Sequence, residues 1–191
     1  MIEKLEEKSK WRKRRNKLLK AITLPIEGEI LDLSCGDGQF LELVHFLKPR
    51  LKLFGADISK KKIEDARNEY GWGLFSIENA YSLNFSNRTF DAIFCNMAFH
   101  HYDQPIKMLS ESKRVLKDNG TIYLMDLFPK NKASQIIYNL RGCNEDYHFE
   151  RYYRLEELEK LCDKNDLRVD KVTSLSQLPR LMVVELKNTL Q

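Results

Sequence analysis

The sequence predicts an α/β fold built on a doubly wound, mostly parallel sheet of seven strands. Between residues 28 and 126, short apolar segments alternate with amphipathic helical segments, which requires right-handed helical crossovers between parallel strands. Near the C-terminus, two strand-like segments at 167–174 and 180–187 are joined by a link too short for a helix, so we expect them to pair antiparallel. An antiparallel C-terminal strand therefore completes the predicted sheet.

Apolar spacing and turn residues place the individual elements along the chain. Ser59 is expected to cap one helix that stops at Gly71, and Asp103 to cap another that ends at Asn119-Gly120. The stretch after the fifth strand is expected to be irregular up to a helix near 154–164. The other expected helices are 3–22 and 39–47, and the expected parallel strands are 29–33, 51–57, 73–77, 90–95 and 121–125.

Length and composition indicate one soluble globular domain, because the 191 residues are 42% apolar and 31% charged. No run of about 18 apolar residues is present and the N-terminus lacks an apolar signal core, so we expect no membrane span and a cytoplasmic location. The four cysteines form no CxxC pair and the four histidines lack metal-site spacing. This pattern predicts reduced thiols and no metal.

The most specific pattern runs from Ile30 to Gly38, where an apolar strand enters a tight glycine turn before a helix. Glycine permits unusual backbone angles and lets a ligand approach the main chain. Asp57 ends the next strand, 19 residues past Gly38, and is placed to accept hydrogen bonds from two ribose hydroxyls. Leu41 occupies the position of the third glycine in GxGxxG, which argues against an NAD-dependent oxidoreductase.

These residues resemble the class I S-adenosylmethionine-dependent methyltransferases, most closely the small-molecule branch that includes the ubiquinone and menaquinone C-methyltransferases. The family pattern LDxGCGxG matches residues 31–38, with Ser34 in place of the first glycine, and RVLKPGG matches 114–120. The resemblance covers residues 28–126 and implies a Rossmann-like fold with S-adenosylmethionine as cofactor. The implied cofactor-binding residues are Asp32, Ser34, Cys35, Gly36, Gly38, Asp57, Ile58, Asn79, Ala80, Asn96 and Met97.

Each of these cofactor residues also has a structural alternative. Asp32 has a local capping or loop role as its alternative, and the two glycines an ordinary turn. For Asp57 the alternative is a cap of the following helix, and for Asn79 an Asx turn.

The acceptor side is less specific, because an activated methyl group needs alignment with a nucleophile more than a fixed catalytic triad. His100 and His101 are the candidates for a catalytic base, although we prefer the alternative that this pair is a structural part of its turn. The missing Pro-Pro-aromatic sequence after Asn96 argues against amino methylation of DNA. Residues 147–153 form either an aromatic lid or a packed loop. The substrate-binding candidates are Trp11, Tyr102, Tyr147, His148 and Tyr152.

The net charge of +4 is concentrated at one end. Residues 1–20 hold nine Lys/Arg and three Glu, a local +6, so the rest of the chain sums to −2. The expected helix that contains these basic residues either binds RNA phosphates or, as we prefer, is a solvated face that covers the cofactor cleft. Residues 1–191 are divided into a basic N-terminal helix (1–24), a cofactor-binding core (25–126), an acceptor lid (127–153) and a C-terminal helix with the strand pair (154–191).

The sequence thus predicts a methyltransferase that acts on a small organic acceptor, such as an aromatic metabolite. An RNA methyltransferase that uses the basic helix, and a non-catalytic protein that binds S-adenosylmethionine, are the alternatives. Neither the oligomeric state nor the methylated atom is predicted.

Overall fold

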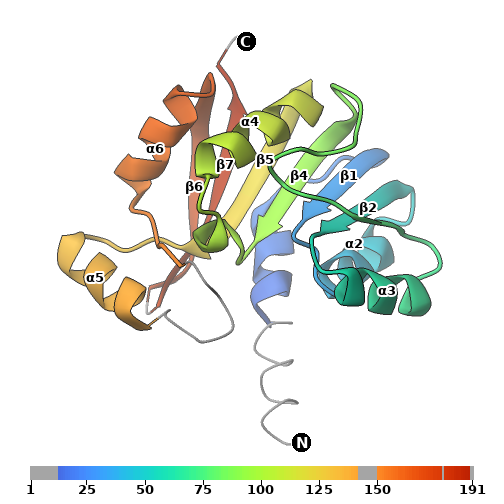
Figure 1. Ribbon diagram of the computed structural model, residues 1–191, viewed down its shortest axis with the longest axis horizontal. Coiled ribbons are helices and arrows are strands. Elements are labelled where there is room, and N and C mark those ends of the chain that lie inside the picture. Colours follow the sequence, from blue (N-terminus) through green and yellow to red (C-terminus); the bar gives the residue numbers. More distant parts are fainter. Residues whose placement is uncertain (1–12, 142–149, 178, 190–191) are drawn as a thin grey trace, which may run out of the picture.

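The computed structural model describes residues 13–141, 150–177 and 179–189. A single seven-stranded sheet crosses the molecule in the order β3-β2-β1-β4-β5-β7-β6 (Figure 1). The first five strands pair in parallel, and β7 runs antiparallel to both β5 and β6, as the sequence predicts. The strands are β1 (Gly28–Leu33), β2 (Leu51–Asp57), β3 (Leu74–Ile77), β4 (Phe90–Asn96), β5 (Leu116–Leu127), β6 (Leu167–Gln177) and β7 (Arg180–Asn188).

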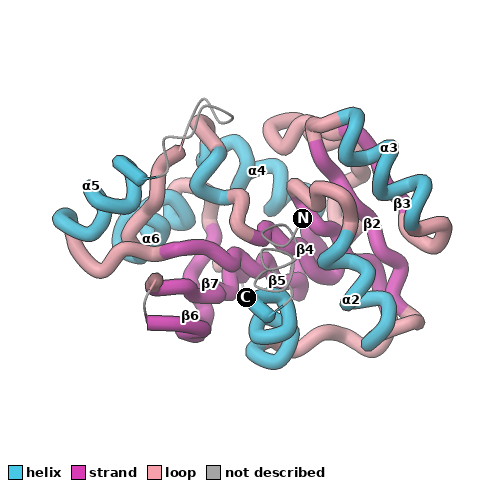
Figure 2. Tube along the Cα trace, turned by 90° about the horizontal axis from the view of Figure 1, so that it is seen from below, coloured by secondary structure: helices cyan, strands magenta, loops and turns pink. Residues whose placement is uncertain are grey.

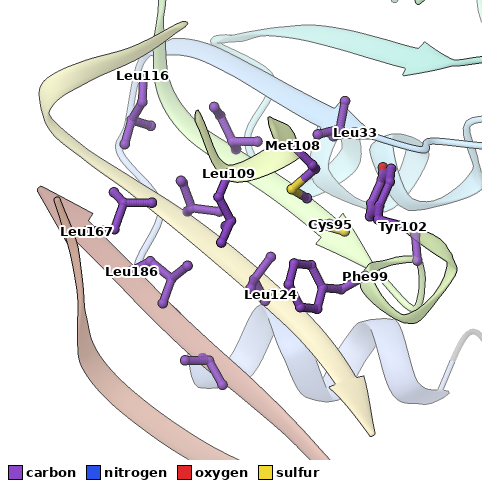
Figure 3. Packing of buried hydrophobic residues seen from close by; sticks show 14 of the residues in the cluster. Leu33, Cys95, Phe99, Tyr102, Met108, Leu109, Leu116, Leu124, Leu167 and Leu186 are labelled. Carbon is purple, nitrogen blue, oxygen red and sulfur yellow. The ribbon is translucent and has the colours of Figure 1, made fainter. Parts of the chain in front are cut away.

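Helices cover both faces of this sheet, with α4 and α6 on one side and α2 on the other (Figure 2). Met108 and Leu109 of α4 pack over Leu124 of β5 and Leu186 of β7 (Figure 3). The opposite face buries side chains of α2 and α3. The helices are α2 (Gln39–Leu47), α3 (Lys60–Glu69), the short 3-10 helix η1 (Phe99–His101), α4 (Pro105–Val115), α5 (Lys132–Arg141) and α6 (Leu155–Asp163).

Residues 13–21 are also helical and pack on the same face of the sheet as α2 and α3. Leu18 is fully buried there, and Leu19 and Ile22 pack against the same cluster, as their spacing predicts. The remainder of the expected helix, residues 3–12, lies outside the described residues. Among the described residues, no helix is both long and apolar enough to span a bilayer.

Two predicted boundaries of α4 are wrong. Gln104 precedes the helix and Pro105 is its first residue, while the Asp103 carboxylate accepts a hydrogen bond from the Tyr81 hydroxyl at 2.6 Å. The helix ends at Val115 rather than at Asn119-Gly120, because Leu116 is already buried and pairs with Phe90 of β4. Tertiary pairing therefore overrides the local turn signal, and the Asn-Gly pair lies within an irregular part of β5.

The stretch after β5 is not irregular throughout, because it contains α5. This helix leaves apolar side chains in solvent, with Ile136 59% and Leu140 73% exposed. The spacing of Ile136, Ile137 and Leu140 is itself helical, so the sequence carried a usable signal for this helix.

Candidate active site

The glycine-rich turn after β1 has three residues with positive φ, namely Ser34 (66°), Gly36 (59°) and Gly38 (81°). This left-handed region suits glycine, and a Cβ at Gly38 would come within 3.0 Å of the ring of Phe75. Ser34 holds the same conformation despite its side chain, which costs roughly 1–2 kcal/mol. Its N–H donates to the Ala56 carbonyl of β2 at 2.7 Å. The turn is therefore shaped by its own backbone and by the neighbouring strand.

Asp57 fixes this turn from the end of β2. Its Oδ2 accepts the N–H of Gly36 at 2.9 Å, and its Oδ1 accepts the N–H of Ser59 at 2.9 Å. The bond from the Ser59 N–H resembles the helix-capping role given above as the alternative for Asp57. The N-cap residue of α3 is nevertheless Ser59, as predicted. Each carboxylate oxygen has a further lone pair, so Asp57 can still accept ribose hydroxyls.

Asp32 is a buried carboxyl group at the carboxyl end of β1, only 2% exposed. Burial raises its pKa from 3.8 to about 7, while the positive charge of Arg15 and a hydrogen bond from Asn96 act in the opposite direction. Asn96 Nδ2 donates to Asp32 Oδ1 at 3.2 Å. The side-chain oxygen of Asn96, Oδ1, is buried and has no hydrogen-bond partner among the described residues. A buried acid beside an unmatched amide oxygen fits the ammonium of an amino acid, such as the one in S-adenosylmethionine.

Tyr102 connects this site to the turn after β4. Its hydroxyl and Ser34 Oγ form a hydrogen bond of 2.6 Å, which gives the unusual serine of the first loop a specific partner. Burial raises the pKa of Tyr102, so the phenol stays protonated. The Tyr81 ring lies 5.9 Å from that of Tyr102. Asn79 Oδ1 accepts the Tyr81 N–H at 2.9 Å, which is the Asx turn given above as its structural alternative, and the amide NH₂ of Asn79 can still donate to an adenine.

The remaining cofactor candidates differ in exposure. Ile58 follows Asp57 and is 74% exposed, so it offers an apolar surface beside the ribose position. Met97 has a φ of 51° and donates its N–H to the Met125 carbonyl at 2.7 Å. Ala80 packs against the hydrophobic core. The Cys35 thiol is buried and burial raises its pKa, so its backbone is the part available to a ligand.

The histidine pair lies at the other end of the site, in η1. His100 Nδ1 faces Asp126, at 2.9 Å from Oδ1 and 2.8 Å from Oδ2, and both side chains are buried. The Asp126 carboxylate also accepts the His100 N–H at 3.1 Å. The Tyr152 ring stacks on His100 with centroids 4.5 Å apart. Trp11, Tyr147 and His148 lie outside the described residues.

Three residues of this site were not singled out from the sequence. Asp126 lies near the carboxyl end of β5, where ligands of parallel α/β sheets gather, and that placement was a usable signal. Glu150 lies 3.8 Å from His101 within the aromatic stretch. Arg15 donates to Gln39 of α2 at 2.9 Å, and its charge acts on Asp32. Nothing in a run of basic residues distinguishes this arginine from its neighbours.

Comparison with known proteins finds relatives among methyltransferases. Residues 31–124 match a protein family described as a methyltransferase domain. The demethylmenaquinone methyltransferase of Thermotoga maritima is 33% identical over 123 residues, which cover 64% of this chain and 52% of that protein. The chain thus spans about half the length of the curated relatives that it matches first.

Two solved structures show the same fold. A SAM-dependent methyltransferase from Aquifex aeolicus has a TM-score of 0.71 at 20% identity, covering 90% of this chain and 88% of that one. An O-methyltransferase of neocarzinostatin biosynthesis, solved with S-adenosyl-L-homocysteine and 1,4-dihydroxy-2-naphthoic acid, has a TM-score of 0.71 at 15% identity, covering 84% and 49%. The matched family segment, the strand order and the glycine turn together identify residues 31–124 as a class I methyltransferase domain, the type that uses S-adenosylmethionine as cofactor.

Proposed function

We propose that this protein transfers a methyl group from S-adenosylmethionine to a small acceptor with a quinone-like or other aromatic ring. The observation that carries the proposal is the convergence of Asp32, Asp57 and Asn96 at the carboxyl ends of β1, β2 and β4. Two carboxylates and an unmatched amide oxygen suit a ligand with an ammonium group at one end and ribose hydroxyls in its middle.

The bound cofactor supplies a methyl group activated by its sulfonium. Transfer would leave the electron pair of the broken sulfur–carbon bond on sulfur, and the acceptor atom that bonds to the methyl carbon would release its proton to water. Asp32 and Asp57 hold the two ends of the cofactor in our proposal, and Tyr102 braces the loop between them through Ser34. The chain then has to align the acceptor at about 3 Å from the methyl carbon and exclude water.

Aromatic side chains support a flat acceptor. Tyr81, Tyr102 and Tyr152 lie on the turns that follow β3, β4 and α5, and flat organic ligands are commonly held by such rings. The curated relative is named for demethylmenaquinone, and the solved O-methyltransferase contains a dihydroxynaphthoic acid. We place the activity in the cytoplasm, a proposal supported by three buried free cysteines at 35, 95 and 162.

A methyl-release assay tests this function directly. The full chain is incubated with radiolabelled S-adenosylmethionine and, in separate reactions, with a dihydroxynaphthoic acid, a reduced quinone and bulk RNA. We expect labelled product from an aromatic acceptor and none from RNA. Labelled RNA whose yield falls steeply with salt would instead support the basic N-terminal helix as a phosphate-binding surface.

Calorimetry with S-adenosylhomocysteine and with NAD tests the identity of the cofactor independently of the acceptor. Binding of the first ligand alone supports the proposed cofactor site. Binding without any transfer, across all acceptors, would favour a protein that binds S-adenosylmethionine without catalysis. Binding of NAD alone would contradict the proposal.

A further inference from the structure

Three side chains with metal-binding atoms converge beside the acceptor end of the site. His100, His101 and Glu150 each offer one ligand atom, and these three atoms lie within 4.8 Å of one another. His101 Nδ1 and Glu150 Oε1 are 3.8 Å apart. Residue spacing does not reveal this cluster, because two adjacent histidines have no metal-site spacing and the glutamate lies 49 positions after His101.

Asp126 orients the first of these ligands. Its carboxylate accepts from His100 Nδ1 at 2.8 Å, so Nδ1 carries the proton and Nε2 keeps its lone pair. A carboxylate behind a histidine is the usual outer partner in metal sites, because it fixes the tautomer and increases the basicity of the ring. The Tyr152 ring, stacked at 4.5 Å and 17°, holds the plane of the imidazole.

Glu150 provides the second, independent observation. Its side chain is only 8% exposed, and its Oε2 is buried with no hydrogen-bond partner among the described residues. A buried carboxylate oxygen without a partner is costly, and a cation removes that cost. The main chain holds this glutamate close to the histidines, because the next residue, Arg151, donates its N–H to the His100 carbonyl at 2.8 Å.

We propose that His100, His101 and Glu150 bind a divalent transition-metal ion such as Zn²⁺. Two imidazoles and one carboxylate match the donor set of open zinc sites, which leave a fourth position for water or substrate. Zinc binds nitrogen and oxygen at about 2.0–2.2 Å, so the ligand atoms have to converge by roughly 1 Å. Rotation of the His101 and Glu150 side chains supplies this movement, and His101 at 26% exposure keeps a path for the ion.

The site also deepens the proposed function, and this part of the inference rests on it. Tyr102 follows His101 directly and reaches the cofactor loop through Ser34, so the ion lies on the acceptor side of that loop. At the open position, the ion would bind a hydroxyl oxygen of the acceptor and lower its pKa. The acceptor class is then a ring that carries a hydroxyl group next to the methylated atom.

Metal titration of the full, untagged chain tests the site. After removal of metals with a chelator, Co²⁺ is followed by its visible absorption and Zn²⁺ by calorimetry. We expect one equivalent of each to bind to the wild-type protein. Asp126→Asn should weaken the affinity by about 10–100-fold, and Glu150→Gln and His101→Gln by at least as much. His45→Gln is the matched control, because His45 stacks on Trp72 at 4.2 Å and should keep full affinity.

Calorimetry with S-adenosylhomocysteine shows whether each variant is folded. Retained cofactor affinity with lost metal affinity supports the site. No stoichiometric binding to the wild-type chain, or equal metal affinity in Glu150→Gln and the wild-type chain, would overturn it and leave only an ion pair between His101 and Glu150. Metal binding without methyl transfer to any acceptor would contradict the proposed function but not the metal site.

Discussion

The cofactor side and the acceptor side of the site are built in different ways. On the cofactor side, the main chain supplies most contacts, as when Ser34 and Cys35 donate to the Ala56 carbonyl and Gly36 donates to Asp57. On the acceptor side, side chains from distant parts of the sequence meet, as His100 and Asp126 do across 26 positions. A site built from backbone is fixed by turn geometry, whereas a site built from side chains depends on the whole tertiary structure.

The largest effect is expected from Asp57→Ala, which removes the side chain that joins the turn to β2. The variant loses two bonds to main-chain N–H groups and, in our proposal, those to the ribose. Hydrogen bonds to a charged acceptor contribute about 1.5–3 kcal/mol each, so affinity for S-adenosylhomocysteine should fall by about 100–1,000-fold. Calorimetry measures this change. Asp65→Ala on the exposed face of α3 is the control, and equal affinity in both variants would show that Asp57 does not hold the ribose.

The second test uses the raised pKa of Asp32. The ionised form attracts the cofactor ammonium, so wild-type affinity should fall as the pH drops below about 7. Asp32→Asn should bind about 10–100-fold more weakly at pH 8 and lose this pH dependence. An unchanged pH profile in the variant would mean that another group controls binding.

The same substitution should stabilise the protein without ligand. The folded state holds the Asp32 proton up to about pH 7 and the unfolded state releases it near 3.8, so the stability of the folded state falls as the pH rises through this interval. Asp32→Asn removes that loss, on the order of 4 kcal/mol at pH 8 for a shift of about three pKa units. Thermal unfolding at pH 5 and pH 8 measures it, and a variant less stable than wild type at pH 8 would contradict the burial argument.

A smaller effect separates the two sides of the site. Tyr152→Ala removes the ring stacked on His100 and should lower kcat/KM for the acceptor by about 10-fold, since such ring contacts contribute about 0.5–1.5 kcal/mol beyond the area they bury. Cofactor affinity should stay within about twofold of wild type. An equal loss of kcat/KM and of cofactor affinity would show that the ring stabilises the fold and does not contact the acceptor.

The smallest effect is expected from Tyr102→Phe. This change deletes the hydroxyl that bonds Ser34 at 2.6 Å and leaves the ring in place. One such bond contributes about 0.5–1.5 kcal/mol, so affinity for S-adenosylhomocysteine should fall by about two- to tenfold. Ser34→Gly is the informative partner, because it loses the same bond while it relieves the strained φ of 66°.

The contrast between the two sides explains what could be predicted. Gly36, Gly38 and Asp57 were found because a tight turn with positive φ restricts residue type locally, and the parallel pairing of the first five strands followed from the βα alternation. Glu150 was missed because its role arises only when the segment after α5 meets η1, whereas Asp126 has a usable signal in its place near the carboxyl end of β5. The end of α4 was misplaced for a similar reason, since pairing with β4 decides where β5 begins.

Leu18 has a consequence for how this domain can be shortened. The matched family segment begins at residue 31, yet the fully buried Leu18 and the bond from the Tyr123 hydroxyl to the Thr23 carbonyl lie before it. A truncation at the matched boundary would uncover apolar side chains of α2 and β5 and release Asp32 from the charge of Arg15. We therefore expect a stably folded domain to require residues that precede the matched family segment, Leu18 and Thr23 among them.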